Sequence, residues 1–237
     1  MKTEGRNAVL ELLKTEKNIE KLLLEKNPQG SLKAIFAEAR KRNVRVQFVD
    51  RKVLDKQSGE GRHQGVIAFS TDYEYSSLDD IISARKDGVG FIVVCDGIED
   101  VHNLGSIIRV AECAGADGVI IPANNSASVT EAVIRISAGA ANHMKVAKVN
   151  SINRAVDELK KNGYWLYALE ADGEDIYSAD LTGNIAIVVG GEDSGVRKLT
   201  REKCDFTLSI PLKGKVNSLN ASVALGIAAY EAVRKRR

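Results

Sequence analysis

Long apolar runs are missing from the sequence: none comes near the roughly 18 to 20 residues that a membrane helix needs. The first residues also lack the apolar core of a secretory signal. Cysteine is scarce, and Cys95, Cys113 and Cys204 are odd in number and widely spaced, which supports neither a disulfide framework nor a zinc cluster. We therefore expect a cytoplasmic protein with no metal and no membrane partner.

Several catalytic motifs are missing as well. No Gly-Lys-Ser/Thr follows the glycines of residues 189–195, so there is no P-loop, and the glycines of residues 59–65 do not have the dinucleotide-binding spacing. The sequence contains no Ser/His/Asp order with a nucleophile elbow and no HExxH, and its three histidines are scattered. These absences count against a nicotinamide enzyme, and none of the histidines is expected to be a catalyst.

The composition and the distribution of charge are informative. With 237 residues, 44% of them hydrophobic and 28% charged, the chain has the composition of a soluble folded protein of one large or two small domains. Its net charge is +2, but residues 1–70 hold 15 Lys and Arg against 9 Asp and Glu, and the remainder is net negative. A basic front part is typical of a module that handles a polyanion. A solvated helix surface would explain the same charge equally well.

The spacing of the apolar residues predicts two α/β parts joined by a polar linker at 71–87 with a short helix at 78–85. In the first part we expect a largely parallel sheet, with helices at 7–13 and 31–42 and strands at 19–24, 44–49 and 65–69. In the second part we expect strands at 91–95, 119–121, 145–149, 165–169, 185–189 and 208–211, and helices at 104–114, 130–137, 152–161 and 219–237.

Three polar segments follow expected strands of the second part, in the position where open α/β sheets bind ligands. The first runs from Asp96 to Arg109. Its Asn103 is a preferred helix-capping residue, so capping by Asn103 and an ion pair of Arg109 would explain it without a ligand. The second, residues 189–195, is rich in glycines, which let the backbone approach a ligand and supply N–H donors.

The third segment, residues 209–222, gathers Asn217, Ser218 and Asn220 behind a basic Lys-Gly-Lys turn. Ser218 is expected to cap the last helix. Capping does not explain why the other polar residues crowd beside it, so we interpret the segment as part of a site.

Taken in order, the three segments resemble the motifs of the SpoU group of the SPOUT RNA methyltransferases. The matching residues are, in chain order, Asn103-x-Gly105-x-x-x-Arg109, Gly190-x-Glu192-x-x-Gly195 and Ile210-Pro211-x-x-Gly214-x-x-x-Ser218-Leu219-Asn220-x-Ser222-x-Ala224. The resemblance extends over residues 90–237, with Val101 where a proline is frequent and Leu212 where a methionine is frequent. The front part, through Gly5-Arg6-Asn7-Ala8-Val9 and Arg62-His63-Gln64-Gly65-Val66, resembles the extra N-terminal domain of the RlmB-like ribosomal enzymes.

The resemblance implies a fold and a division into domains. Residues 88–237 would form a knotted SPOUT methyltransferase domain, an α/β domain with a mostly parallel sheet and a deep trefoil knot. Residues 1–70 would form a small ribosomal-protein-like α/β domain that binds the RNA substrate, and residues 71–87 the linker. Members of the group form homodimers with the active site near the subunit interface, so we expect a homodimer.

The resemblance also implies an activity. The family transfers a methyl group from S-adenosylmethionine to a ribose 2′-hydroxyl, and the RlmB-like members act on a guanosine of 23S ribosomal RNA. A tRNA 2′-O-methyltransferase and a non-catalytic RNA-binding assembly factor on the same scaffold are the alternatives. The N-terminal domain favours ribosomal RNA, and the presence of all five family active-site residues favours an enzyme.

The resemblance assigns residues to each role. The catalytic positions are Asn103, Arg109, Glu192, Ser218 and Asn220. The cofactor-binding positions are Leu169, Val189, Gly190, Gly191, Ile210, Leu212, Ser218 and Leu219. The RNA-binding positions are Arg6, Arg62, His63 and Arg109. Arg109 is the family's proposed base, although a guanidinium is normally always charged, so orienting a phosphate and stabilising the alkoxide is the alternative role. Glu192 would hold Arg109 or Asn103, and Ser218 and Asn220 would fix the loop and the ribose.

Overall fold

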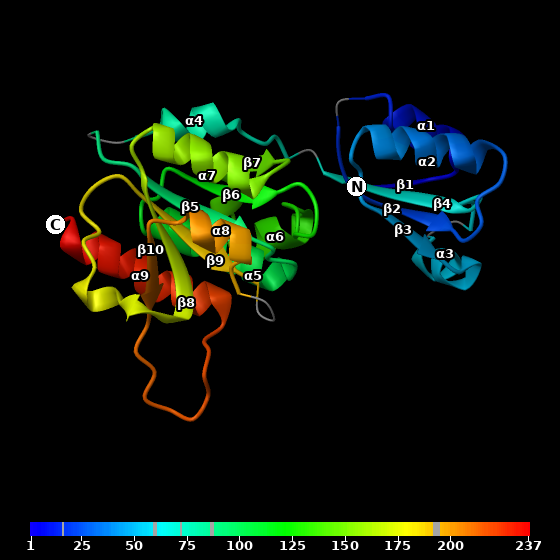
Figure 1. Ribbon diagram of the computed structural model, residues 1–237. Coiled ribbons are helices and arrows are strands. Elements are labelled where there is room, and N and C mark those ends of the chain that lie inside the picture. The colour runs from blue at the N-terminus through cyan, green and yellow to red at the C-terminus, as the bar shows by residue number, and fades with distance from the viewer. Residues whose placement is uncertain (16, 59–60, 72, 86–87, 192–194) are drawn as a thin grey trace. The chain divides into compact units, whose positions relative to one another are not determined.

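The computed structural model describes residues 1–15, 17–58, 61–71, 73–85, 88–191 and 195–237. The chain divides into two compact units, Met1–Glu74 and Tyr75–Arg237 (Figure 1). The segment 71–87, predicted to be the linker, is therefore shared between the units, and its helix α4 (Leu78–Ile82) packs in the core of the second. In the described ranges, no helix is both long enough and apolar enough to cross a membrane.

The first unit contains a four-stranded sheet with the strand order β1-β4-β2-β3. Its elements are β1 (Lys2–Glu4), α1 (Arg6–Leu12), β2 (Asn18–Glu25), α2 (Ser31–Lys41), β3 (Val46–Val49), α3 (Arg51–Gln57) and β4 (Val66–Thr71). Strand β4 is antiparallel to both β1 and β2, and only β2 and β3 are parallel. The prediction of a largely parallel sheet is therefore wrong for this unit. Strand β1 and helix α3 are too short and too polar to stand out in the sequence.

The two faces of this sheet are covered differently. Helices α1 and α2 lie on one face, as Figure 1 shows, and bury a large apolar cluster that includes Leu22, Leu24 and Ile35. Helix α3 lies on the other face, where it contributes Leu54 to a smaller buried cluster with Leu23, Val49 and Ile67. The second face consequently carries more polar side chains than the first.

The second unit is built on a six-stranded sheet of order β10-β8-β9-β5-β6-β7, in which all the pairings are parallel. Its strands are β5 (Phe91–Asp96), β6 (Gly118–Pro122), β7 (Val146–Val149), β8 (Trp165–Asp175), β9 (Ile185–Gly190) and β10 (Phe206–Ser209). Its further helices are α5 (Val101–Cys113), α6 (Glu131–Ile136), α7 (Ile152–Lys161), α8 (Lys198–Lys203) and α9 (Ala221–Lys235), with short 3₁₀ turns at Ala140–Asn142 and Ile176–Ser178.

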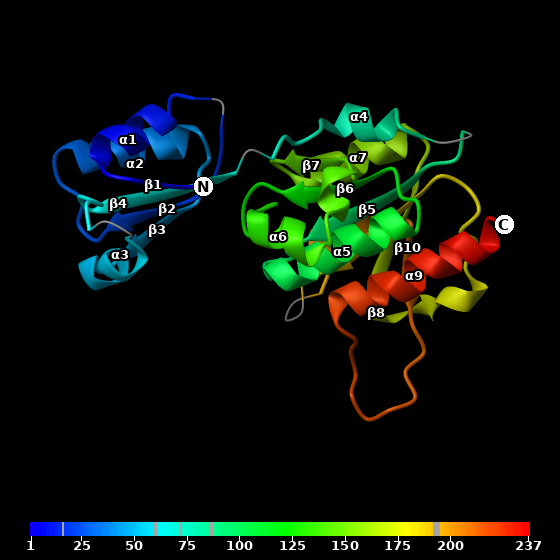
Figure 2. The same cartoon turned by 180° about the vertical axis from the view of Figure 1, so that it is seen from behind.

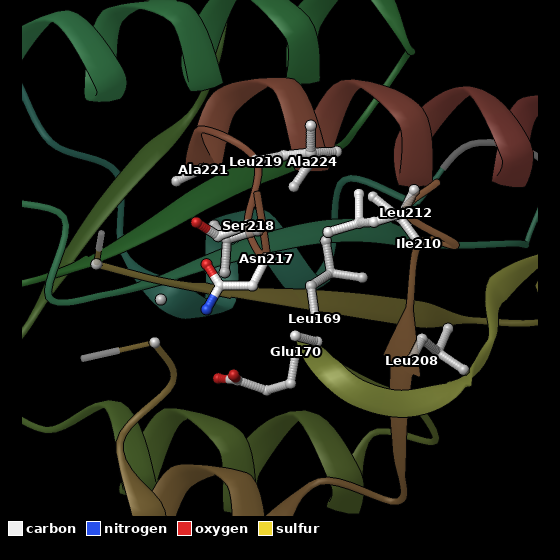
Figure 3. Close-up of a pocket in the computed structure, with 15 residues that line it drawn as sticks. Leu169, Glu170, Leu208, Ile210, Leu212, Asn217, Ser218, Leu219, Ala221 and Ala224 are labelled. Atoms are coloured by element: carbon white, nitrogen blue, oxygen red, sulfur yellow. The ribbon is translucent and has the colours of Figure 1, made fainter. Parts of the chain in front are cut away.

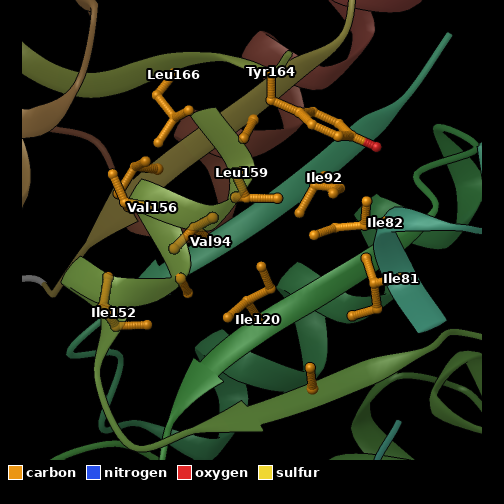
Figure 4. Close-up of a cluster of buried hydrophobic side chains, with 14 of the residues drawn as sticks. Ile81, Ile82, Ile92, Val94, Ile120, Ile152, Val156, Leu159, Tyr164 and Leu166 are labelled. Atoms are coloured by element: carbon orange, nitrogen blue, oxygen red, sulfur yellow. The ribbon is translucent and has the colours of Figure 1, made fainter. Parts of the chain in front are cut away.

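Helices cover both faces of the second sheet, which is why β5 and β6 are buried along their whole length and are almost entirely apolar. On one face, α4 and α7 bury a cluster against the central strands, in which Ile152, Val156 and Leu159 of α7 meet Ile92 and Ile120 (Figure 4). On the other face, α5 and α9 lie side by side (Figure 2). The α/β fold with a mostly parallel sheet is confirmed, and the knot stays a prediction.

Two basic residues at the end of α9 hold loops of the second unit in place. Arg236 donates hydrogen bonds to the carbonyl oxygens of Leu181, Gly183 and Gly90, which lie before β9 and β5. Lys235 donates to the carbonyl oxygens of Tyr177 and Ala179. These two cations therefore tie the end of α9 to the loops at the amino ends of the strands.

Gly105 sets how closely α5 approaches α6. A Cβ atom at this position would lie 2.6 Å from Cγ2 and 2.8 Å from Cβ of Ile136. We expect Gly105→Ala to lower the free energy of unfolding by about 1–3 kcal/mol, because overpacking outweighs the gain in helix propensity. Thermal and urea unfolding measure this. Gly183→Ala is the control, since none of the residues placed by the structure comes within 4 Å of the added methyl group there. Equal stability of both variants would contradict the expectation.

Candidate active site

The carboxyl ends of β9 and β10 border a pocket of about 390 Å³. Four segments line it: residues 169–171 of β8, residues 189–191 with Gly195 after β9, alternate residues from Leu208 to Leu212, and residues 217–219 with Ala221 and Ala224 at the start of α9. The pocket therefore lies where the parallel strands end, and it gathers segments that are far apart in the sequence.

A break in the pairing of β8 makes room for the pocket. Up to Thr207, strand β10 pairs with β8 in register, with Thr207 opposite Ala168. The next residue of β10, Leu208, lies opposite Glu174. Residues 169–173 are therefore outside the ladder between these two strands, and the first three of them line the pocket.

The turn after β9 folds back against the end of its own strand. A Cβ atom at Gly190 would lie 1.9 Å from the carbonyl carbon of Gly195 and 2.1 Å from the nitrogen of Val196, so only glycine fits at this position. The N–H of Gly195 donates to the carbonyl oxygen of Gly191 at 2.9 Å. Gly195 has a φ of +61°, in the left-handed region that also favours glycine. Both glycines border the pocket with their backbone.

Two carboxylates hold this turn from different strands. Glu170 of β8 accepts a hydrogen bond from the N–H of Val196. The buried Asp96, at the end of β5, accepts one from the N–H of Arg197 at 3.0 Å, and the Arg197 Nε lies 3.6 Å from the other oxygen of the same carboxylate. Because β8 and β5 lie on either side of β9, the two contacts fix the turn across three strands.

The pocket has an apolar side and a polar side (Figure 3). Leu169, Ile210 and Leu212 point toward one another on the apolar side. The carboxylate of Glu170 and the polar ends of Asn217 and Ser218 point into the other side. The arrangement suits a ligand with an apolar, planar part and a polar, positively charged part.

The eight residues that the sequence predicts to bind a cofactor all line this one pocket: Leu169, Val189, Gly190, Gly191, Ile210, Leu212, Ser218 and Leu219. Their contact with a cofactor stays a prediction. The motifs missed Glu170 and Ala171, which also line the pocket, because no motif covers β8. The polar break Glu170-Ala171-Asp172-Gly173 in an otherwise apolar strand is the signal that could have found them.

The first and third motifs meet through two asparagines. Asn220 donates a hydrogen bond from Nδ2 to Oδ1 of the buried Asn103 at 2.7 Å. The Oδ1 of Asn220 accepts from the N–H groups of Ser222 and Val223, so Asn220 is the N-cap of α9. Ser218 is therefore not the cap, and it lines the pocket instead.

Asn103 is not a helix cap either. Helix α5 begins three residues earlier than predicted, and the carboxylate of Asp100 accepts from the N–H groups of His102 and Asn103. Because Asp100 satisfies these donors, the Asn103 side chain is free of the capping role and bonds to Asn220.

The other two predicted catalytic residues are placed differently. Arg109 is exposed on α5 and is not one of the described residues that line the pocket. Glu192 lies outside the described residues. Within one chain, the structure thus brings together Asn103, Ser218 and Asn220 but leaves Arg109 on the surface.

The sequence matches two family models: the SpoU rRNA Methylase family over residues 90–230, and the RNA 2′-O ribose methyltransferase substrate binding domain over residues 3–76. The chain belongs to the SpoU rRNA methylase family. A relative from Bacillus subtilis (strain 168), named as the TrmH family tRNA/rRNA methyltransferase YacO, is 41% identical over 98% of this chain and 94% of its own.

Solved structures share the fold of this SpoU methylase. The SpoU methyltransferase AviRb from Streptomyces viridochromogenes, crystallised with AdoMet, aligns over 100% of this chain and 90% of its own with 23% identity and a TM-score of 0.64. An RNA 2′-O ribose methyltransferase aligns over 100% and 88%, with 26% identity and a TM-score of 0.59. The chain is therefore an RNA methyltransferase, as the motifs predict.

The three predicted RNA-binding residues in the first unit of this SpoU methylase differ in how exposed they are. Arg62 is exposed, and Arg6 is half-buried, with its guanidinium bonded to the carbonyl oxygen of Gln64 and to Ser31. His63 is only 1% exposed. Its Nδ1 accepts from the N–H of Gly65, so its Nε2 carries the proton and donates to Asp55 at 2.9 Å. His63 therefore shapes the loop and does not present its ring to RNA.

Two of the three cysteines of the SpoU methylase, Cys95 and Cys204, are not activated as nucleophiles. Burial raises the pKa of the Cys95 thiol to about 12, and burial raises the pKa of the Cys204 thiol to about 12 as well, so both stay protonated near neutral pH. In the part of the chain that the structure describes, no three His, Cys, Asp or Glu side chains are grouped as metal ligands would be.

The N-cap that Asn220 forms and its hydrogen bond to Asn103 can be separated by measuring the stability of two variants. We expect Asn220→Ala to lower the free energy of unfolding by about 1–2 kcal/mol, because α9 loses its N-cap. Asn220→Asp keeps the cap oxygen but removes the donor to Asn103, so it should unfold close to wild type. Urea unfolding followed by circular dichroism measures both. Equal losses in the two variants would mean that the bond to Asn103, and not the cap, dominates.

Proposed function

We propose that this SpoU methylase transfers a methyl group from S-adenosylmethionine to the 2′-hydroxyl of a ribose in ribosomal RNA, and that the target is a guanosine of 23S ribosomal RNA. The observation that carries the proposal is the convergence of the second and third motifs on one pocket at the ends of β9 and β10. A tRNA target is the second candidate, because YacO is named for both tRNA and rRNA.

The pocket fits S-adenosylmethionine in shape and in charge. Leu169, Ile210 and Leu212 offer apolar walls for a planar base, and the backbone at Gly190 and Gly191 comes close enough to bond its polar edge. Among the described residues that line the pocket, Glu170 alone is charged, and its carboxylate complements a positive sulfonium and amino group. AviRb, which shares the fold, was crystallised with AdoMet.

The residues of the chain supply position and electrostatics for the reaction. When bound, S-adenosylmethionine supplies a methyl group that is already activated on sulfur. The protein must then hold the ribose oxygen in line with this methyl group and stabilise the negative charge that this oxygen develops as its proton leaves to water. We assign the first task to Ser218 and the Asn103–Asn220 pair, and the second to Arg109, whose permanent charge suits stabilising an alkoxide or fixing a phosphate. Glu192 would orient Arg109.

A homodimer would complete the site. Helix α9 exposes Val223 (49%) and Tyr230 (52%), and no other atom of the described residues lies within 4 Å of the position that a Cβ of Gly226 would take. Positions 223, 226 and 230 share one helical face, and exposed apolar faces of this kind mark association surfaces. Arg109 is exposed on the neighbouring α5. We propose that two copies associate through this face, so that Arg109 of one subunit acts at the pocket of the other.

The two units would divide the work. The match of residues 3–76 to a substrate-binding model and their positive charge support RNA binding by the first unit, which corresponds to the predicted domain 1–70. The second unit, corresponding to the predicted domain 88–237, would carry the transfer. The polar residues near 71–87 would join them.

Arg109 tests the chemistry. We expect Arg109→Ala to abolish methyl transfer, by at least a hundredfold in rate, while the affinity for S-adenosylmethionine stays within about twofold. Calorimetry measures the affinity. Mapping of ribose methylation in ribosomal RNA and tRNA from cells lacking the gene, complemented with each variant, measures the transfer and identifies the nucleotide.

Arg135→Ala, an exposed arginine of α6, is the matched control and should restore methylation fully. If Arg109→Ala restores methylation, the assignment of Arg109 is wrong. If no ribose methylation in either RNA depends on the gene, the proposed function is wrong.

Tyr230 tests the dimer. We expect the wild type to sediment as a dimer and Tyr230→Asp to sediment as a monomer, because a buried, unpaired carboxylate is costly at an apolar interface. The same variant should lose methyl transfer but retain its thermal unfolding midpoint to within a few degrees. Sedimentation velocity at micromolar concentration measures the mass. A monomeric wild type, or a Tyr230→Asp dimer with full activity, would contradict the proposal.

A further inference from the structure

The less covered face of the first sheet carries an ordered row of cations around one aromatic ring. Phe69 of β4 lies directly opposite Lys2 of β1 on one side and Lys21 of β2 on the other. Residues that are opposite each other in a sheet point to the same face. The N–H of Leu22 donates to the carbonyl oxygen of Arg45 at 2.8 Å, which places Arg45 beside Lys21 at the start of β3. The row Lys2–Phe69–Lys21–Arg45 therefore crosses all four strands.

The alternation of side chains fixes the direction of Arg45. Val44 and Val46 pack against the cluster under α1 and α2, so Arg45 between them points to the opposite face. Phe69 packs against the small cluster on that opposite face, together with Leu23 and Ile67. Helix α3 contributes Leu54 to this cluster and meets the row at Lys2, whose Nζ donates to the carbonyl oxygen of Gln57. Phe69 is half-buried, and Lys21 and Arg45 are exposed.

The row is accessible and positively charged. Lys21 and Arg45 are exposed, and in the described part of the chain neither forms an ion pair with a carboxylate. Lys2 is partly engaged, with Glu4 at 2.9 Å and with the carbonyl oxygen of Gln57 at the end of α3. The Nζ of Lys21 lies 4.8 Å from the centre of the half-buried Phe69 ring.

We propose that this row is a binding surface for a single-stranded segment of the RNA substrate, with Phe69 as a stacking platform for one base and with Lys21 and Arg45 as phosphate contacts. The inference rests on the proposed RNA substrate and adds which face of the first unit reads it. An aromatic ring flanked by cations on an open sheet is the combination by which proteins hold unpaired bases and their backbone.

The position of Lys21 is compatible with this role. Its ammonium group sits over the ring on a flexible four-carbon stem, and a cation over an exposed aromatic ring is held weakly. A base that stacks on Phe69 takes the place of this ammonium group, which then reaches the adjacent phosphate. Duplex RNA offers no unpaired base for the ring, so the surface selects single strands.

Binding of RNA by the full chain tests the proposal. The probes are a fluorescent 20-nucleotide single-stranded RNA of mixed sequence and the duplex formed with its complement, measured by anisotropy over a range of salt concentrations. We expect Phe69→Leu, which keeps an apolar side chain against Leu23 and Ile67, to weaken single-strand binding about tenfold. Phe69→Tyr should restore it, because a ring is again present.

The charges are tested separately. We expect Lys21→Ala and Arg45→Ala each to lower the slope of log Kd against log salt by about 0.7. Lys33→Ala is the matched control, an exposed lysine of α2 on the opposite face of the sheet, and its Kd should equal that of the wild type. Unfolding midpoints of all variants show that they are folded.

The outcomes separate this inference from the proposed function. If Phe69→Leu binds single-stranded RNA as tightly as the wild type, the row is not the binding surface. This result would leave the proposed methyl transfer, which is tested separately in cells, unaffected. If the wild type binds single strand and duplex with equal affinity, selection by stacking is refuted. If no ribose methylation depends on the gene but Phe69→Leu weakens the binding of single-stranded RNA, the proposed function is wrong and the proposed binding surface is supported.

Discussion

The contact between the end of β9 and the turn that follows it constrains the rest of the site. At Gly190 the backbone lies closer to Gly195 and Val196 than any Cβ atom would allow, so two stretches of main chain share a space that side chains occupy elsewhere. Glu170 and Asp96 fix this contact from the strands on either side. Since the turn borders the pocket with its backbone, the pocket keeps its shape only while the glycines and both carboxylates are in place.

The pocket depends on an interruption in the regular pairing of strands β8 and β10. Strand β8 leaves the ladder with β10 over residues 169–173, and the hydrogen bonds given up there leave room between β8 and the loop that precedes α9. A close approach at Gly173, where a Cβ would lie 2.6 Å from the backbone of Thr207, brings the two strands together again. Strands β8 and β10 therefore pair on both sides of residues 169–173 of β8, and the ladder between them is interrupted at these residues.

Several polar side chains, among them one that the sequence predicts to bind RNA, hold the fold together instead. His63 closes a loop through Asp55 and Gly65, and Arg236 binds three carbonyl oxygens. Asn220 serves both purposes, because one end of its amide caps α9 and the other bonds Asn103. A cationic or amide side chain in a motif is therefore not necessarily exposed, because a buried backbone group satisfies its hydrogen bonds as well as RNA would.

The sequence by itself determined the strands and most of the helices of the second unit, though not α8, and eight of the residues that line the pocket. Apolar runs such as residues 91–95 and 185–189 specify buried parallel strands, and the motifs named residues of the pocket, because both signals are local. Only the tertiary structure decided the pairing of Asn103 with Asn220, the break in β8, the burial of His63 and the antiparallel partners of β4. These depend on contacts between residues far apart in the chain, which no local pattern encodes.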